Sequence, residues 1–395
     1  MRSKNEGENE TIVSLINMQK SIVRNPLHPF DYILAGVIMI LLILGILILS
    51  SVSATLSQER FGTTFYFLKH QFFFGLIPGI ILAFLFFKIK LAVLKKWSPV
   101  LLLINLGLVG MVFLPKIGAG AGGAARWISV GMISFQPSEF LKLTFILYLA
   151  TWLGSRDKKT ISSKKPKGFG ETLIAFLIII GIISSFLIFQ PDISTLGIIV
   201  LVAALMYFIS NTPLWHSVLI FLATSGGLLT LIRIAPYRAN RLLVFLNPLL
   251  DPMGKGYQMK QTLITVGSGG ISGLGLGMSL QKFGFLPQSM SDTIFAIFAE
   301  ETGFIGSLIL IFLFLIFLWR GFKIGKSAQD NFFQLTALGI SSWIVLQGFI
   351  NIGAMIGILP LTGIPLPFIS YGGSHLTAEM IGIGILLNIS RYKTA

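Results

Sequence analysis

Long apolar runs separated by short polar segments recur along the whole chain. The runs at 33–48 and 173–189 are almost wholly apolar, so they lack the alternation of half-buried strands. In lipid a segment must bond its own backbone polar groups, and a helix needs roughly 20 residues to cross. The pattern therefore predicts an all-α integral membrane protein with about ten transmembrane helices. The predicted helices are Ile33–Val52, Phe72–Phe87, Val100–Phe113, Pro137–Leu153, Leu173–Phe189, Ser194–Ile209, Leu214–Ile232, Thr293–Trp319, Phe333–Ile358 and Phe368–Ile389.

Composition agrees with a membrane protein. Of the 395 residues, 54% are hydrophobic and only 11% are charged, which is too apolar for a soluble domain of this size. The absence of cysteine excludes disulfides and thiolate metal sites. A polar stretch precedes the first apolar run, so we expect no cleavable signal peptide. The predicted organisation is a cytoplasmic tail at 1–31, one polytopic membrane domain at 32–391 and a cytoplasmic tail at 392–395.

The formal charge of +15 is spread between the apolar runs, which favours a role in membrane topology over binding to nucleic acid. Most basic residues fall in alternate connections and in both tails. Placing that set in the cytoplasm leaves the connections at 190–192 and 360–367 outside, without Lys or Arg. The positive-inside rule therefore predicts that both termini are cytoplasmic. The set comprises Arg2, Lys4, Lys20, Arg24, Lys88, Lys90, Lys95, Lys96, the cluster from Arg156 to Lys167, Arg320, Lys323, Lys326, Arg391 and Lys393.

The segment 236–292 between the seventh and eighth predicted helices is too long for a simple connector. Apolar residues at 257, 259, 263 and 266 predict a short interfacial helix within it. This extracytoplasmic loop and the loop that contains Arg126 carry basic residues against the positive-inside rule, among them Arg241 and Lys282. Long loops translocate largely regardless of charge, and basic loops also attract anionic substrates. Both interpretations stay open on charge alone.

Several polar residues near the predicted outer boundary could carry chemistry. Glu139 and Lys142 lie one helical turn apart, which fits either a structural ion pair or a site for a charged headgroup. Arg126 beside Trp127 could bind a pyrophosphate or anchor the chain at the interface. Because Ser272 replaces the third glycine of a dinucleotide fingerprint and no Gly-Lys-Ser/Thr follows, we expect no nucleotide at Gly267–Ser272.

Two aspartates precede predicted helices. Asp192 lies before the sixth and Asp292 before the eighth, so each could be a helix N-cap. Asp292 differs because it closes the basic loop, and the helix that follows carries Glu300 and Glu301. These acids, with Glu139, could equally mark a proton-coupled transporter. The residues by themselves thus predict a polar site facing outward and leave transport and transfer chemistry as alternatives.

The same residues resemble the SEDS family (shape, elongation, division and sporulation), to which FtsW and RodA belong. The resemblance covers nearly the whole membrane region, and ordered motifs of this length are specific. The motifs are Arg126–Ile128, Phe135–Lys142, Gln190–Asp192, Asp251–Pro252 with Gly256–Gln258, Gly267–Gly270, Phe285–Pro287, Asp292 with Ile294–Ala296, Ala299–Glu301 and Gly363–Ser374.

The resemblance implies a peptidoglycan glycosyltransferase that polymerises lipid II, the undecaprenyl-pyrophosphate disaccharide-peptide, with inversion and with Asp292 as general base. Before that aspartate the chain has Met290-Ser291, where many relatives have His-Thr. Substrate binding is expected from Arg126, Gln136, Glu139, Lys142, Asp192, Arg241 and Lys282. A divalent cation, Mg²⁺ or Mn²⁺, is compatible with this chemistry, and no nucleotide or organic cofactor is expected.

The segment Gly275–Pro287 and the polar N-terminal tail are more similar to the division member, FtsW, than to the elongation member, RodA. The implied partners are a class B penicillin-binding transpeptidase and other proteins of the division complex. The implied location is the bacterial inner membrane at the septum. The alternatives are a lipid II flippase or other transporter, an elongation-type polymerase of the RodA kind, and a non-catalytic scaffold in which Asp292 only caps a helix.

Overall fold

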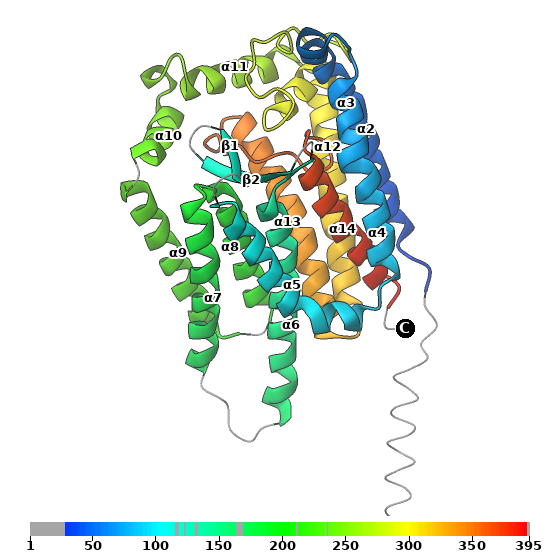
Figure 1. Cartoon of the computed structure of the whole chain (residues 1–395), viewed down its shortest axis with the longest axis vertical. Coiled ribbons are helices and arrows are strands. Elements are labelled where there is room, and N and C mark those ends of the chain that lie inside the picture. Colours follow the sequence, from blue (N-terminus) through cyan, green and yellow to red (C-terminus); the bar gives the residue numbers. More distant parts are fainter. Residues whose placement is uncertain are drawn as a thin grey trace, which may run out of the picture.

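The chain is described here by a computed structural model that covers residues 28–114, 118–121, 124–130, 133–162, 169–210, 212–234 and 236–392 (Figure 1). The described residues form a bundle of long helices with a small sheet. The longer helices are α2 (Tyr32–Phe61), α5 (Leu91–Met111), α6 (Pro137–Ser162), α7 (Phe169–Phe189), α8 (Ile193–Ile209), α9 (Leu214–Ile234), α12 (Ile294–Lys326), α13 (Asn331–Met355) and α14 (Gly373–Ile389). Between α2 and α5 the chain forms α3 (Tyr66–Gln71), a π-helical turn η1 (Phe72–Leu76) and α4 (Ile77–Lys88), which follow one another without a break.

All ten predicted segments coincide with helices. Seven helical stretches of the described residues are long and apolar enough to cross a membrane, and α8 is a shorter apolar helix. The number of crossings and the cytoplasmic location of the termini stay predictions. The last segment was wrong at its start, because α14 begins at Gly373 rather than Phe368. Pro365, Pro367 and the left-handed backbone of Phe368, with φ of 64°, prevent a regular helix there.

The core of the bundle is built on α13 and α14. In α13, 83% of the most apolar 18-residue window is buried, compared with 6% in α9, which therefore lies at the periphery. Helix α14 packs along α4, and α13 packs between α12 and α6. At Gly384 a Cβ atom would lie 2.2 Å from the carbonyl oxygen of Ala83, so only glycine permits this approach of α14 to α4.

Both ends of the described chain lie at one end of the bundle. The backbone N–H of His28 donates to Arg391 O at 3.2 Å, and the N–H of Asp31 donates to Ser390 Oγ at 3.1 Å. The two ends of the described chain therefore lie side by side, as an even number of crossings requires. Most residues of the predicted tails, and part of the basic cluster at 156–167, lie outside the described residues.

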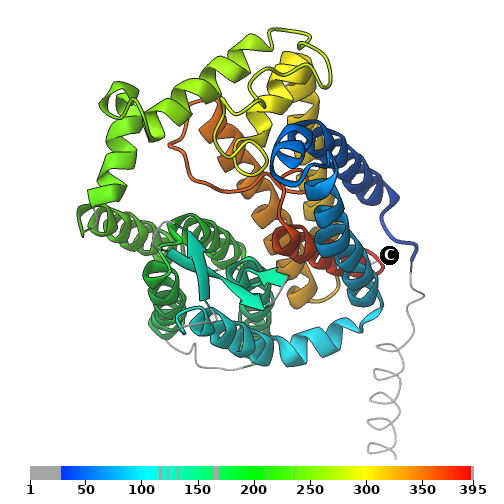
Figure 2. The same ribbon diagram turned by 45° about the horizontal axis from the view of Figure 1, so that its top comes forward.

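The opposite end carries the large loop and the sheet, and is called the loop end below (Figure 1). The loop contains α10 (Pro236–Leu246), the 3-10 turn η2 (Pro248–Leu250) and α11 (Lys255–Ser268). The helix predicted around 257–266 is thus confirmed as α11, whereas α10 was not predicted. Figure 2 shows α10 and α11 following an arc along the rim, with the sheet over the side formed by α5 to α8.

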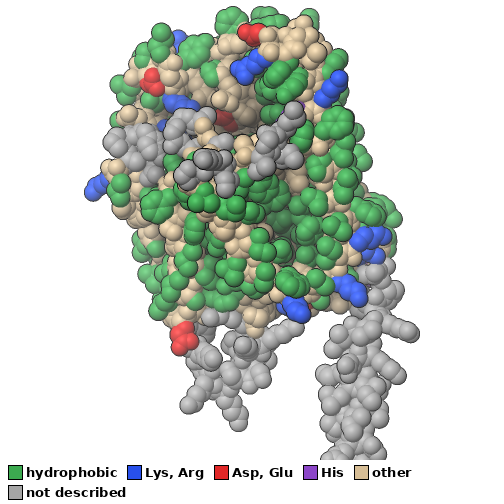
Figure 3. All heavy atoms as spheres, viewed as in Figure 1, with side chains coloured by type: hydrophobic (Ala, Val, Ile, Leu, Met, Phe, Trp, Pro, Cys, Tyr) green, Lys and Arg blue, Asp and Glu red, His purple; other side chains and the backbone are tan. Residues whose placement is uncertain are grey.

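The sheet was not predicted from the sequence. Strands β1 (Gly118–Ala121), β2 (Ala124–Val130) and β3 (Ile133–Phe135) pair antiparallel in the order β1-β2-β3. Ile128 faces Gly118 on one side and Phe135 on the other. Figure 3 shows the resulting surface: hydrophobic side chains cover the middle of the face, while charged side chains lie toward its upper and lower parts.

Candidate active site at the loop end

Asp292 lies in the last turn of the large loop, directly before α12. Helix α12 begins at Ile294, and its N-cap is Thr293, which makes no side-chain cap hydrogen bond. The carboxylate of Asp292 instead accepts a hydrogen bond from Ser291 Oγ at 3.1 Å. Capping of α12, which the sequence left as an alternative for Asp292, therefore finds no support in this geometry.

The surroundings of Asp292 combine burial with positive charge. Burial raises the pKa of the Asp292 carboxyl, while the hydrogen bond from Ser291 and the charges of Lys255 and Arg241 act in the opposite direction. These cations belong to α11 and α10, so the loop brings them over the end of α12. Arg241 was expected at this site, whereas Lys255 was not singled out. Figure 3 shows that the upper part of this face is hollowed, with acidic and basic side chains nearby.

Arg126 binds the turn between α7 and α8. Its Nε donates to the carbonyl oxygen of Gln190 at 3.3 Å, and Nη2 donates to the carbonyl of Pro191. Strand β2 places the guanidinium there, so Arg126 fastens the sheet to this turn. The role of Arg126 in binding a pyrophosphate stays a prediction.

Asp192 and Gln136 lie beside the turn between α7 and α8 that Arg126 binds. The Asp192 carboxylate accepts from Thr195 N at 3.4 Å, so Asp192 is the N-cap of α8. Its other oxygen accepts from Ser138 Oγ at 3.1 Å, and Gln136 Nε2 donates to that hydroxyl at 3.1 Å. Both carboxylate oxygens of Asp192 have protein donors, and Asp192 is only 4% exposed. Asp192 therefore holds the start of α8 against the start of α6.

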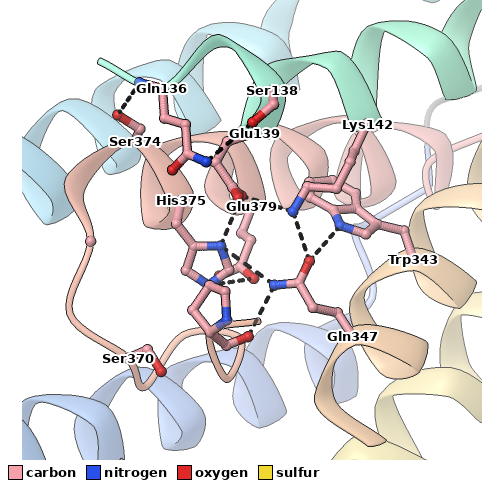
Figure 4. Close-up of polar contacts among 12 residues, drawn as sticks. Gln136, Ser138, Glu139, Lys142, Trp343, Gln347, Ser370, Ser374, His375 and Glu379 are labelled. Atoms are coloured by element: carbon pink, nitrogen blue, oxygen red, sulfur yellow. Dashed lines mark hydrogen bonds and ion pairs between the residues drawn. The ribbon is translucent and has the colours of Figure 1, made fainter. Parts of the chain in front are cut away.

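Glu139 and Lys142 form an ion pair, one of the two alternatives that the sequence left open, inside a larger buried network (Figure 4). Lys142 Nζ lies 2.8 Å from Glu139 Oε2 and 2.8 Å from Gln347 Oε1. His375 Nδ1 lies 3.0 Å from Glu139 Oε2, and its Nε2 lies 3.1 Å from Glu379 Oε1. The network joins α6, α13 and α14, and all five side chains are buried.

An indole completes the network. Trp343 Nε1 donates to Gln347 Oε1 at 3.0 Å, and the Lys142 ammonium lies 5.2 Å from the centre of the indole ring. The sequence analysis missed Gln347, His375 and Glu379. The spacing of His375 and Glu379, four residues apart in an apolar segment, was a usable signal.

Lys282 lies in a separate cluster. Its ammonium donates to Ser51 Oγ at 3.1 Å and lies 3.6 Å from Glu301 Oε1, which also accepts from Ser51 Oγ at 2.8 Å. The neighbouring Glu300 accepts from Ser268 Oγ at 3.3 Å. Lys282 and these acids therefore fasten α2, the large loop and α12 together, and a role of Lys282 toward a leaving group stays a prediction.

Asp292 is thus a partly buried carboxylate at the end of the large loop, and the charges of Lys255 and Arg241 act on it. Such a group can hold a hydroxyl and accept its proton. The residues that the structure describes hold no cluster of three or more His, Asp or Glu side chains suited to a metal.

The fold and this site define a multi-pass helical membrane protein with a polar site at one end of the bundle. The family model for the cell cycle proteins FtsW, RodA and SpoVE matches residues 32–395. The chain belongs to this family, which confirms the resemblance seen in the sequence.

Curated relatives match over almost their whole length. Stage V sporulation protein E of Bacillus subtilis is 40% identical over 365 residues, which cover 92% of this chain and 97% of that protein. The protein named "Probable peptidoglycan glycosyltransferase FtsW" of Coxiella burnetii is 38% identical over 358 residues, with 90% and 94% covered. Its namesake in Wigglesworthia glossinidia brevipalpis is 38% identical over 387 residues, with 96% and 99% covered.

Solved structures have the same fold. A chain from a study of how a peptidoglycan synthase complex coordinates polymerization and crosslinking aligns with a TM-score of 0.76 at 25% identity, covering 92% of this chain and 99% of that one. The rod shape determining protein RodA of Thermus thermophilus aligns with a TM-score of 0.67 at 23% identity, covering 92% and 98%. The arrangement of helices described above is therefore that of this family.

Proposed function

We propose that this protein is a peptidoglycan glycosyltransferase that polymerises lipid II, with Asp292 as the general base. The carboxylate takes the proton from a sugar hydroxyl while that hydroxyl attacks the anomeric carbon of a second lipid-linked sugar. The pyrophosphate leaves from the opposite face, so the anomeric configuration inverts. A pyrophosphate leaves without protonation, so the reaction needs one carboxylate rather than the pair of a glycosidase.

The observation that carries this proposal is the state of the Asp292 carboxylate. It accepts a hydrogen bond from Ser291 and does not cap α12, so it retains capacity to accept a proton. Its raised pKa brings it closer to the working range of a base. Two relatives named "Probable peptidoglycan glycosyltransferase FtsW" match this chain over 90% and 96% of its length, which supports the same reaction class.

Lys255 and Arg241 are the cations that we assign to the departing pyrophosphate. The charges of both act on the Asp292 carboxylate and lower its pKa, and positive charge in this part of the loop would stabilise a departing pyrophosphate. A divalent cation, if bound here, would add positive charge to this stabilisation. Of the other expected residues, Arg126, Gln136 and Asp192 order the corner between the sheet and α8. Substrate binding by Glu139, Lys142 and Lys282 stays a proposal.

The partner and location that we propose follow from the relatives. A solved neighbour belongs to a peptidoglycan synthase complex, which supports assembly with a class B penicillin-binding transpeptidase. Relatives named FtsW support a place at the septum in the bacterial inner membrane. Stage V sporulation protein E is 40% identical to this chain, compared with 38% for these relatives, so a role in sporulation fits the same reaction. An elongation role of the RodA kind stays the alternative.

The test uses purified protein, with its transpeptidase partner, and lipid II. Wild type makes glycan strands that resolve on a gel. Asp292→Asn removes the base, and we expect kcat to fall by about 10²- to 10⁴-fold. Glu59→Gln, at an exposed carboxylate at the loop end of α2, is the matched control and keeps the wild-type rate. An Asp292→Asn protein as fast as wild type would exclude this base.

The alternative is a lipid II flippase, which the buried charges of Glu139, Lys142 and Glu379 favour. A flippase moves fluorescent lipid II across liposomes without lengthening glycan. We expect the opposite result, polymerisation without translocation. Translocation that persists while no glycan forms would replace the proposed function with transport.

A further inference from the structure

The main chain at Asp292 and the two residues before it accepts hydrogen bonds at three successive carbonyl groups. The N–H of Tyr371 donates to Met290 O at 2.9 Å, and Ser370 Oγ donates to Ser291 O at 2.5 Å. Asn351 Nδ2 donates to Asp292 O at 2.7 Å. None of these bonds uses the Asp292 carboxylate. They fix the main chain of the segment 290–292 and leave the Asp292 side chain available for chemistry.

Two of the three donors come from the segment 364–371, which joins α13 to α14. Asn351 binds this segment as well, because its Nδ2 also donates to Ile364 O at 2.7 Å. Ser370 Oγ accepts from the N–H of Leu366 at 2.8 Å while it donates to Ser291 O. The Ser370 hydroxyl therefore stabilises the turn at 366–370 and also binds the loop that carries Asp292.

The turn contains a residue in an unfavourable conformation. Phe368 has φ of 64°, in the left-handed region that bulky side chains rarely adopt. Such a backbone persists only where its surroundings hold it. Here the N–H of Phe368 donates to Glu379 Oε2 at 2.9 Å, and Glu379 is fully buried on α14. On the other side Gly45 of α2 is so close that a Cβ atom there would lie 2.3 Å from Phe368 O.

The same carboxylate links the turn to the buried network. Glu379 Oε1 lies 3.1 Å from His375 Nε2, and His375 contacts Glu139 (Figure 4). Gln347, which binds Lys142, donates from Nε2 to Pro365 O at 3.2 Å and so holds the other end of the segment. The network in the core therefore extends to the backbone of Asp292 through one short segment.

We propose that Ser370 and Glu379 are positioning residues for Asp292: Glu379 holds the strained turn at Phe368, and Ser370 transmits that position to the carbonyl of Ser291. This inference rests on the proposed function for its catalytic meaning. Neither side chain needs to contact the substrate. Loss of either one leaves the carboxylate present but less well placed, so the chemical step slows while substrate binding is preserved.

The test combines amide hydrogen exchange with kinetics on the full-length protein. In Ser370→Ala we expect exchange in peptides covering 287–293 and 364–371 to be at least about tenfold faster, with α5 and α6 unchanged. Polymerisation should show kcat lower by about 10- to 100-fold and an unchanged KM for lipid II. Ser341→Ala removes a buried hydroxyl that bonds within α13 and is the control for both readouts.

Glu379 gives an independent test with a conservative variant. Glu379→Gln retains an oxygen acceptor for the N–H of Phe368, whereas Glu379→Leu removes it. We expect the glutamine variant to exchange and react like wild type, and the leucine variant to behave like Ser370→Ala. Equal loosening of 364–371 in both Glu379 variants would overturn the proposal.

Unchanged exchange at 287–293 in Ser370→Ala, or equally faster exchange in every helix, would also overturn it. These results are separate from a failure of the proposed function. If wild-type protein makes no glycan from lipid II, the glycosyltransferase assignment fails, while the exchange measurements still decide whether Ser370 and Glu379 hold the turn of Asp292.

Discussion

Asp292 and Glu139 are both acidic side chains toward the loop end of the bundle, but their surroundings differ. Glu139 is 4% exposed and has Lys142 and His375 within 3.0 Å of one oxygen. Asp292 is partly exposed, accepts a hydrogen bond from Ser291, and meets its cations at longer range. The Glu139 carboxylate is paired with charged side chains of the protein. The main chain of Asp292 is fixed by hydrogen bonds, while its carboxylate can still accept a proton.

This difference indicates that Glu139 serves the stability of the fold, whereas Asp292 is suited to chemistry. A buried ion pair that loses one partner leaves an uncompensated charge, so its residues are needed for folding. A carboxylate with spare acceptor capacity contributes little to the fold and can take a proton from a substrate. The substitutions below act on one side of this comparison or the other.

The largest effect on stability is expected from breaking the buried pair. Lys142→Met leaves Glu139 without its cation, and we expect a loss of about 3–5 kcal/mol of stability, measured by thermal unfolding in detergent. The double variant Glu139→Gln with Lys142→Met removes both charges and should recover most of that loss. A Lys142→Met protein as stable as wild type would show that the network does not hold the bundle together.

An intermediate effect is expected from pH. The Asp292 base must be ionised, so the rate falls by about tenfold per pH unit below its raised pKa. Stability moves the other way: the folded state binds this proton more tightly than the unfolded chain. That stabilisation is complete below the ordinary pKa of the carboxyl and is lost as the pH rises through the raised value. The measurement is the polymerisation rate as a function of pH, and the residual rate of Asp292→Asn should not fall at low pH in this way. A fall that persists in Asp292→Asn would belong to another group.

The smallest effect is expected from a more exposed ion pair. Lys95 Nζ lies 3.0 Å from Asp330 Oδ2, and these side chains are 29% and 27% exposed. Because solvent screens the pair, Lys95→Ala should cost about 0–1 kcal/mol in the same unfolding measurement. A loss as large as that of Lys142→Met would mean that burial does not set the strength of these pairs.

Local patterns were sufficient for most of the fold. Apolar runs identified every long helix among the described residues, since a run of this length satisfies its backbone only as a helix in lipid. The sheet was missed because the glycine-rich stretch at 118–125 lacks the alternation that predicts a strand. The pairing of its strands with Ile128 at the centre depends on contacts that no local pattern encodes.

The candidate site divides in the same way. The spacing of Glu139 and Lys142 was enough to place them on one helix face, because residues three apart are neighbours there, but it left open whether they pair with each other or bind a headgroup. Their contacts with Gln347 and His375 join residues more than 200 positions apart in the chain. The contacts of Lys282, which was expected to bind substrate, could not be predicted from the sequence, because its partners Ser51 and Glu301 come from α2 and α12.

For Asp292 the sequence determined that a carboxylate ends a basic loop before a helix, and motif resemblance supplied its expected role. Whether that carboxylate caps the helix was decided by the tertiary structure. Bonds from Tyr371, Ser370 and Asn351 fix the backbone of 290–292, and α12 starts with Thr293 as its cap. Hydropathy is a property of each segment and can be found locally, but the orientation of one side chain depends on donors from distant parts of the chain.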